Sequence, residues 1–559
     1  MTSGVKRALA TSGLLPAVRK ARRGLWLATD PAIRERARRY RDEFDGFRRR
    51  YGAALGSVPA PAPTKTALVS GSACPTLEAE LALIIAMRMA GCRPVVMLQD
   101  HWRMLRPYYE LAGVEEVRLW SEFDAVGGEM PMAAAALDHA SSMTDVAALM
   151  HGRVRVGRAA LSSLFRRHRI GSLNLETASD RRMLEQSLDV SVTMADQAGR
   201  MLNTIRPDVA LFWDTEYSPT AELFDACIGR GVDTIAYRTA HQTNGLIFKR
   251  YSDANWDEQV SSLSAQSWTT LRSMPWSAAQ SAALDREIAS SYARGDWFKE
   301  CWTQSEARSM PAAGVRAALG LDPAKKTAIV FSHILWDAPL SWGTPLFTTY
   351  EDWLVETVRA AAANDRVNWI VKIHPANVGK GAREGFGGES AEQRAVRTRL
   401  GALPPHVVLL PPETRINALS IFGVMDYCLT VRGTVGIEAA RLGVPVLAAA
   451  DARYSRRGFT VDSTSRGDYL ERLGGIDRIA PLSPAQRELA ERFAYGMFIR
   501  RPFVMRSVTW DYGMMGERPR ADIHVKTAGD WRSAPDIDAL ARWIRDARDE
   551  DLLVPADES

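Results

Sequence analysis

The chain of 559 residues contains no long hydrophobic run, and this absence excludes a large class of proteins. A membrane-spanning helix needs about 20 consecutive apolar residues, and no stretch approaches that length. The N-terminal region also lacks a secretory signal, because Leu14 and Leu15 are followed directly by Pro16 and by charged residues. We therefore expect a cytoplasmic protein that does not span the membrane.

Cysteine is scarce, and internal repeats are absent. The five cysteines are odd in number and widely spaced, and no C-x-x-C pair occurs. This usage is typical of free thiols in a reducing compartment and argues against a disulfide framework or a zinc site. The cysteines are Cys74, Cys92, Cys227, Cys301 and Cys428.

Positive charge is concentrated at the start of the chain. Residues 1–50 contain 14 Lys and Arg but 5 Asp and Glu. Basic residues interleaved with leucines and Trp26 suit an anionic membrane surface, so we expect a peripheral position on the inner face of the cell membrane. Three alternatives stay open: an organelle presequence, a solvated leader and nucleic acid binding. For the last, no stacking aromatics or known motif are present, so we expect no nucleic acid partner.

Size and pattern predict an α/β protein with two domains. A hydrophobic content of 46% can fill two large cores, and strands alternating with helices imply parallel sheets. Four segments are expected: a basic N-terminal segment with a Pro-rich linker (1–64), a first Rossmann-like domain with helical insertions (65–320), a second Rossmann-like domain (321–500) and a helical tail (501–559). Within the second domain, the glycine-rich segment 379–390 is expected to be a mobile loop bordering the site.

One segment, 428–446, reads as a strand, a glycine turn, a helix and a second buried strand. Gly433 and Gly436 allow a tight turn and a close approach to a ligand, and the N–H groups that open the next helix favour a phosphate. Arg432 adds a fork of donors, Thr434 a hydroxyl, and Glu438 a carboxylate able to accept from sugar hydroxyls. The alternative is a strand–loop–helix unit in which the glycines serve geometry alone.

A second motif lies upstream, in the buried strand 367–373 that ends in Lys372, His374 and Pro375. Ligands of open α/β sheets bind beyond the carboxyl ends of the strands. Lys372 and His374 share strand parity, so both are expected at that rim and on the same face. A lone histidine at a strand end is more often structural, but its pairing with the Arg-Gly-Thr turn favours a ligand site.

These motifs, K-x-H-P followed by R-G-T-x-G-x-E-A-A-x-x-G-x-P-V, resemble the bacterial capsule polysaccharide biosynthesis family. Its members include Kdo transferases, polysialyltransferases and CDP-glycerol glycerophosphotransferases. The resemblance is clearest over residues 327–473. It implies the GT-B fold, in which two Rossmann-like domains face each other across a cleft and the second domain binds the nucleotide. Arg432 departs from the pattern, because many relatives carry a small polar residue there.

The resemblance implies a glycosyltransferase of surface or capsular polysaccharide, or a related glycerophosphotransferase. Its partners would be a nucleotide-activated donor, CMP- or CDP-linked, and a saccharide or lipid-linked acceptor, with no cofactor beyond the donor. Lys372, His374 and Arg432 with its turn can stabilise a leaving phosphate without a metal, and His333, at a strand end, can touch the phosphate or be structural.

No D-x-D sequence follows a strand, so we expect no metal site. Asp536–Asp538 suits the opening turn of a helix that could return to the first domain, and Asp549–Asp551 suits a solvated acidic end. A base is needed if the reaction inverts the anomeric carbon. Glu216 is the candidate and Asp214 its substitute. Two other functions remain open: a UDP-sugar 2-epimerase on the same fold, and a non-catalytic partner in polysaccharide assembly.

Overall fold

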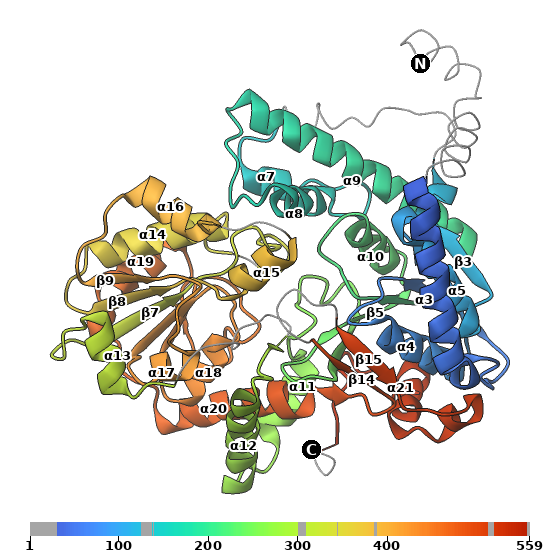
Figure 1. The fold of residues 1–559 in the computed structure, drawn as a ribbon. Coiled ribbons are helices and arrows are strands. Elements are labelled where there is room, and N and C mark those ends of the chain that lie inside the picture. Colours follow the sequence, from blue (N-terminus) through green and yellow to red (C-terminus); the bar gives the residue numbers. More distant parts are fainter. Residues whose placement is uncertain are drawn as a thin grey trace.

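The computed structural model describes residues 31–124, 137, 139–299, 309–343, 345–384, 388–512 and 519–555. Figure 1 shows two α/β units, each built on its own sheet. The expected pair of Rossmann-like domains with parallel sheets is therefore present. The basic residues before position 31 lie outside the described residues.

The first sheet has the strand order β3-β2-β1-β4-β5-β6-β13. The five strands from β3 to β5 run parallel, whereas β6 is antiparallel to β5, and β13 is antiparallel to β6. Strand order reverses between β1 and β4, which marks the switch point of a doubly wound sheet. The strands are β1 (Lys65–Ser70), β2 (Cys92–Leu98), β3 (Glu116–Leu119), β4 (Val209–Phe212), β5 (Asp233–Thr239), β6 (Gly245–Tyr251) and β13 (Phe503–Val504).

The second sheet repeats this plan with the order β9-β8-β7-β10-β11-β12, all parallel. Its switch point lies between β7 and β10. The strands are β7 (Thr327–Phe331), β8 (Asn368–Lys372), β9 (Val407–Leu410), β10 (Tyr427–Thr430), β11 (Val446–Ala448) and β12 (Val461–Asp462).

Both sheets are covered by helices on their two faces. Successive strand residues point to opposite sides, so neighbouring residues of one strand join different cores. In β1, Ala67 and Val69 join the core under one layer of helices, whereas Leu68 joins the core on the other face. In β7, Ile329 and Val330 divide in the same way. The helices of the first unit are α4 (Leu77–Met89), α5 (Arg106–Leu111), α7 (Met143–Ala147), α8 (Val156–His168), α9 (Ala178–Ile205) and α10 (Thr220–Gly229).

The helices of the second unit begin with side-chain caps in several cases. For example, Thr349 accepts from the Asp352 amide at the start of α14, which satisfies one of the free N–H groups there. These helices are α13 (Ala312–Leu319), α14 (Tyr350–Ala362), α15 (Ala376–Glu384), α16 (Ala391–Leu400), α17 (Ala418–Phe422), α18 (Val435–Arg441), α19 (Arg466–Gly474) and α20 (Pro484–Tyr495). The segment 379–390, expected to be a loop, thus begins as part of α15.

Helices α11 (Ala265–Ser273) and α12 (Ala278–Arg294) pack on α20 and share the core of the second sheet through Trp268, Leu284 and Ile288. Figure 1 shows α11, α12 and α20 together beneath the second unit. By packing, the first domain therefore ends near residue 260 and not at the expected boundary of 320.

The N-terminal segment is less separate than its proline pattern suggested. Helix α3 (Pro31–Leu55) lies against α5, where Phe44 and Phe47 each meet the Tyr108 ring edge-on at 5.0 and 4.9 Å. The Tyr51 hydroxyl donates to Asp522 at 2.9 Å. Residues 31–55 are therefore part of the first domain.

The segment after residue 500 returns to the first domain, as expected for Asp536–Arg548. Helix α21 (Pro535–Asp546) packs on α4, β13 extends the first sheet, and β14 (Val508–Asp511) pairs with β15 (Arg520–Ile523). The expected helical tail therefore also contains strands. Among the described residues, no helix is long and apolar enough to cross a bilayer.

Two aspartates of the D-x-D sequences have structural partners. Asp536 accepts from the Ser507 amide and hydroxyl at 2.8 and 2.6 Å. Asp551 is 2% exposed and forms ion pairs with Arg501 and Lys249. The expectation that Asp551 belongs to a solvated acidic end is wrong, because this carboxylate compensates two fully buried cations.

Candidate functional site

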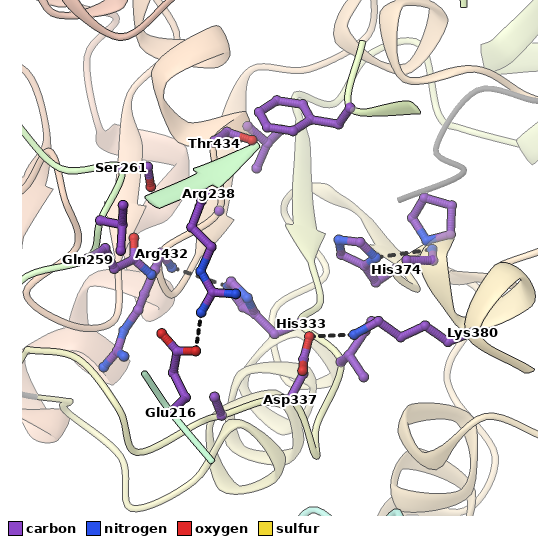
Figure 2. A pocket seen from close by; sticks show the side chains of 18 of the residues that line it. Glu216, Arg238, Gln259, Ser261, His333, Asp337, His374, Lys380, Arg432 and Thr434 are labelled. Atoms are coloured by element: carbon purple, nitrogen blue, oxygen red, sulfur yellow. Dashed lines mark hydrogen bonds and ion pairs between the residues drawn. The ribbon is translucent and has the colours of Figure 1, made fainter. Parts of the chain in front are cut away.

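A cavity of about 1140 Å³ lies between the two domains. Its wall includes the residues that follow β1 and β4 in the first sheet, and β7 and β10 in the second. Both switch points therefore open into one space, where the carboxyl ends of parallel strands place ligands. Figure 2 shows side chains from both domains around this cavity.

Eight of the nine residues expected at the site line the cavity: Glu216, His333, Lys372, His374, Arg432, Gly433, Thr434 and Glu438. Strands β8 and β10 flank β7, which brings the K-x-H-P motif and the Arg-Gly-Thr turn to either side of His333. Gly436 is the exception.

Lys372 ends β8 and is buried, and this burial lowers its pKa to about 8. Nδ1 of His374 accepts from the Ala376 amide at 3.2 Å, so the neutral ring carries its proton on Nε2. Burial, followed by the charges of Lys380 and Lys372, lowers the pKa of His374 to about 4. At neutral pH, His374 is therefore an uncharged hydrogen-bond donor and not an acid.

His333 holds the turn that follows β10. Its Nε2 accepts from the amides of Val431 and Arg432 at 3.3 and 3.2 Å, and its ring stacks on Tyr350 with centroids 4.6 Å apart. Burial, followed by the charge of His374, lowers the pKa of His333 well below its ordinary value. His333 was expected either to touch the phosphate or to be structural. These two hydrogen bonds favour a structural role for its Nε2 atom.

Gly436 is not part of the cavity wall and packs against Tyr454. A Cβ atom at this position would lie 2.3 Å from the Tyr454 hydroxyl, far inside contact distance. The same hydroxyl donates to the Gly433 carbonyl at 2.9 Å. Tyr454 therefore stabilises the turn through this hydrogen bond, and the absence of a side chain at Gly436 leaves room for the tyrosine ring.

Glu438 lies in the first turn of α18 and is buried, not exposed to solvent. It is 4% exposed and accepts a hydrogen bond from the Tyr292 hydroxyl at 2.8 Å, from α12. Burial raises the pKa of Glu438 to about 7. It remains a cavity residue, but its carboxylate is held by a helix outside the motif.

On the opposite wall, Glu216 is 5% exposed and forms an ion pair with Arg238. Burial alone would raise the pKa of Glu216, but the charge of Arg238 lowers it below its ordinary value. Asp214 is one-third exposed on its side chain, and burial together with the charge of Glu216 raises its pKa above the ordinary range. Of these two carboxylates, Asp214 is the one whose pKa is raised.

Sequence reasoning missed a bridge between the domains. Asp337 accepts from the Tyr217 hydroxyl at 2.6 Å and from Lys380 Nζ at 2.5 Å, and Arg166 lies 3.8 Å from the same carboxylate. Burial would raise the pKa of Asp337, but Lys380 and these bonds lower it to about 2. The sequence predicts His333 as a site residue at this strand end, and Asp337, four residues later, was the available signal.

Across the described residues, no group of three or more His, Cys, Asp or Glu side chains could hold a metal ion. The metal-independent reaction remains a prediction.

No protein-family model matches the chain, and no curated protein matches its sequence. Among solved structures, the chain is similar to the Thermosulfurimonas dismutans KpsC beta Kdo 2,4 transferase, with 15% identity, a TM-score of 0.34, and coverage of 53% of this chain and 81% of the other. It is also similar to the Neisseria meningitidis UDP-GlcNAc 2-epimerase bound to UDP-GlcNAc, with 11% identity, a TM-score of 0.26, and coverage of 78% of this chain and 96% of the other. A third similar structure is the glycotransferase of kitacinnamycin, with 16% identity, a TM-score of 0.23, and coverage of 78% of this chain and 95% of the other. Kdo transferases are among the relatives named from the motifs.

Proposed function

We propose that the chain is a metal-independent glycosyltransferase of surface or capsular polysaccharide biosynthesis. It would use a nucleotide-activated donor, CMP- or CDP-linked, and a saccharide or lipid-linked acceptor. One observation carries the proposal: a single cavity has cationic and donor groups on the wall from the second domain and a carboxylate pair on the wall from the first.

The leaving phosphate would lie between the strand end and the turn. As the glycosidic bond breaks, negative charge grows on the phosphate oxygens, and preorganised donors stabilise it most there. Lys372 supplies charge, and the Nε2–H of His374 and the Thr434 hydroxyl supply hydrogen bonds. Glu438 would accept from a ribose hydroxyl of the nucleotide.

The acceptor would bind against the first domain. Its hydroxyl must lose a proton as it attacks the anomeric carbon, if the reaction inverts the configuration. Asp214 would take that proton, and the Arg238–Glu216 ion pair beside it would keep Glu216 ionised. The negative charge of Glu216 in turn keeps the pKa of Asp214 high enough for this role.

Unfolding temperatures measured with CMP, CDP, UDP and GDP test the nucleotide assignment. A ligand that binds only the native state raises the unfolding temperature by mass action. We expect one nucleotide to raise the unfolding temperature of the wild type and Lys372→Ala to lose this shift. The control Lys325→Ala, at a lysine whose side chain is about one-third exposed, is expected to keep it. No shift with any nucleotide would contradict the proposal.

Transferase activity is expected to survive EDTA.

A UDP-sugar 2-epimerase is the second candidate. Four carboxylates, Asp214, Glu216, Asp337 and Glu438, line the cavity, which is the kind of set that epimerisation of a bound sugar requires. Conversion of UDP-GlcNAc without any acceptor, followed by NMR of the sugar, would identify this activity. Release of free nucleotide only when a saccharide acceptor is present would identify transfer.

A further inference from the structure

The guanidinium of Arg432 is unusual among the buried charges of the molecule. The residue is 2% exposed and lines the cavity, yet Nε, Nη1 and Nη2 all lack a hydrogen-bond partner. The ring centroid of Tyr350 lies 5.9 Å from the guanidinium carbon. The backbone amide of Arg432 is held by His333, so the turn that carries the side chain is fixed.

A second guanidinium of the same wall is also incompletely bonded. Nη1 of Arg453 donates to the Ser261 hydroxyl, but its buried Nε has no partner. Burial, with a contribution from the charge of Arg432, lowers the pKa of Arg453 to about 10. Close to Ser261, the buried Oε1 of Gln259 is a hydrogen-bond acceptor without a donor, and Gln259 and Ser261 also line the cavity.

Apart from Lys372, which is also buried at the cavity without a carboxylate partner, the best-buried cations of the described chain are paired. Arg501 and Lys249 share Asp551, and Arg155 pairs with Asp225 at 2.7 Å. In the part of the chain that the structure describes, Arg432 and Arg453 form no ion pair with a carboxylate. An isolated buried charge is strongly unfavourable, so the buried Arg432, with the partly buried Arg453 on the same wall, is expected to have a compensating anion from outside the chain.

The pair is separate from the strand-end donors. Figure 2 shows Arg432, Gln259 and Ser261 on one side of the cavity, and His374 and Lys380 on the other, with His333 between them. We propose that Arg432 and Arg453 form a second anion subsite, which binds a negatively charged group of the donor other than the phosphate held by Lys372. Two parallel N–H groups of a guanidinium fit a carboxylate or a phosphate.

Two chemical groups of a donor meet this description: a carboxylate on the transferred sugar, or the second phosphate of a nucleoside diphosphate. The Oε1 of Gln259 would accept from a hydroxyl beside that group. This inference rests on the proposed function, because it assumes that a nucleotide donor occupies the cavity.

Calorimetric titration with matched ligand pairs tests the subsite and distinguishes the two groups. CMP against CDP, and UMP against UDP, measure the gain from a second phosphate. UDP-glucose against UDP-glucuronate measures the gain from a sugar carboxylate. The wild type is expected to bind the more anionic member of one pair at least about tenfold more tightly, since hydrogen bonds between charged groups reach that value.

The variant Arg432→Met keeps the side-chain volume and removes the charge. It is expected to bind CMP or UMP like the wild type and to lose the gain from the second anion. Its unfolding temperature without ligand is expected to rise, because a buried uncompensated charge has been replaced by an apolar group. Arg432→Lys is expected to keep part of the gain, and the exposed neighbour Arg456→Met is the control that keeps all of it.

The outcomes separate the two proposals. A wild type that binds no nucleotide at all contradicts the proposed function and with it the subsite. A wild type that binds monophosphates but gains nothing from either second anion contradicts the subsite alone. The subsite is equally excluded if Arg432→Met keeps the full gain.

Discussion

At the scale of single residues, the division of labour between Asp214 and Glu216 has the clearest consequence. Asp214→Asn is expected to lower turnover by roughly 10²- to 10⁴-fold, the range for loss of a positioned base. Because the pKa of Asp214 is raised, wild-type turnover is expected to rise with pH above the range of an ordinary aspartate and then to level off. The variant is expected to lose that rise. Initial rates measured across pH check both effects.

Glu216→Gln is the matched comparison, because it removes the neighbouring charge and leaves Asp214. Without that charge the pKa of Asp214 is expected to fall, so the rising part of the profile would move to lower pH. If Glu216→Gln abolished turnover and Asp214→Asn did not, the assignment made from the sequence would hold and the revised one would be wrong.

Lys372 and His374 are expected to respond in opposite ways. His374→Ala should lower kcat by roughly 10²- to 10³-fold, since it removes one donor aimed at developing charge, and should change nucleotide affinity little. Lys372→Ala should weaken nucleotide binding itself. Binding to the wild type should weaken as pH rises above about 8, where Lys372 loses its proton. Calorimetry together with initial rates measures this contrast. Equal losses of affinity in both variants would contradict it.

The residues that line the cavity were largely predictable from the sequence, because a motif at a strand end fixes where its side chains lie. Roles were less accessible. The sequence predicts Glu216 as the base, but its ion pair with Arg238, 22 residues later on a neighbouring strand, forms only in the folded chain. His374 could be placed at the rim, but its neutral state depends on burial and on Lys380, which only the folded chain brings together.

At the scale of elements, the turn between β10 and α18 depends on the close packing of the Tyr454 ring against Gly436. Gly436→Ala is expected to destabilise the protein by about 1–3 kcal/mol, the usual cost of overpacking, because the new methyl group would overlap Tyr454. Gly474→Ala is the control, since nothing lies within 4 Å of a Cβ atom there. Unfolding in urea measures both. A Gly436→Ala protein as stable as the control would contradict this packing role.

Most buried strands were predictable because each is a short apolar run that ends in a turn. Strand β6 was missed, since Lys249 and Arg250 interrupt its apolar pattern. Both charges are buried, and their partners Asp551 and Asp233 lie on other elements. A local reading of the sequence could not supply those partners. The glycines of segment 379–384 similarly concealed α15, which Lys380 anchors to Asp337.

At the scale of the whole molecule, the basic segment can be tested separately from helix α3. Deletion of residues 1–30 is expected to shift the protein from membrane to soluble fractions, and added salt to do so partially, because salt screens exposed charges. The domains are expected to stay folded, since α3 and its contacts with Tyr108 remain. Sedimentation with anionic vesicles measures binding. Unchanged sedimentation would return the segment to the role of a solvated leader.

The return of residues 501–555 to the first domain has a consequence for the order of synthesis. Domains usually fold from the N-terminus as the chain emerges from the ribosome. Here the first sheet acquires β13, and the buried charge of Lys249 acquires Asp551, only after the whole second domain has been made. The second domain is therefore expected to mature first. A chain stopped at residue 500 should protect its second domain from protease while the first domain is digested, because the first domain then still lacks β13 and Asp551.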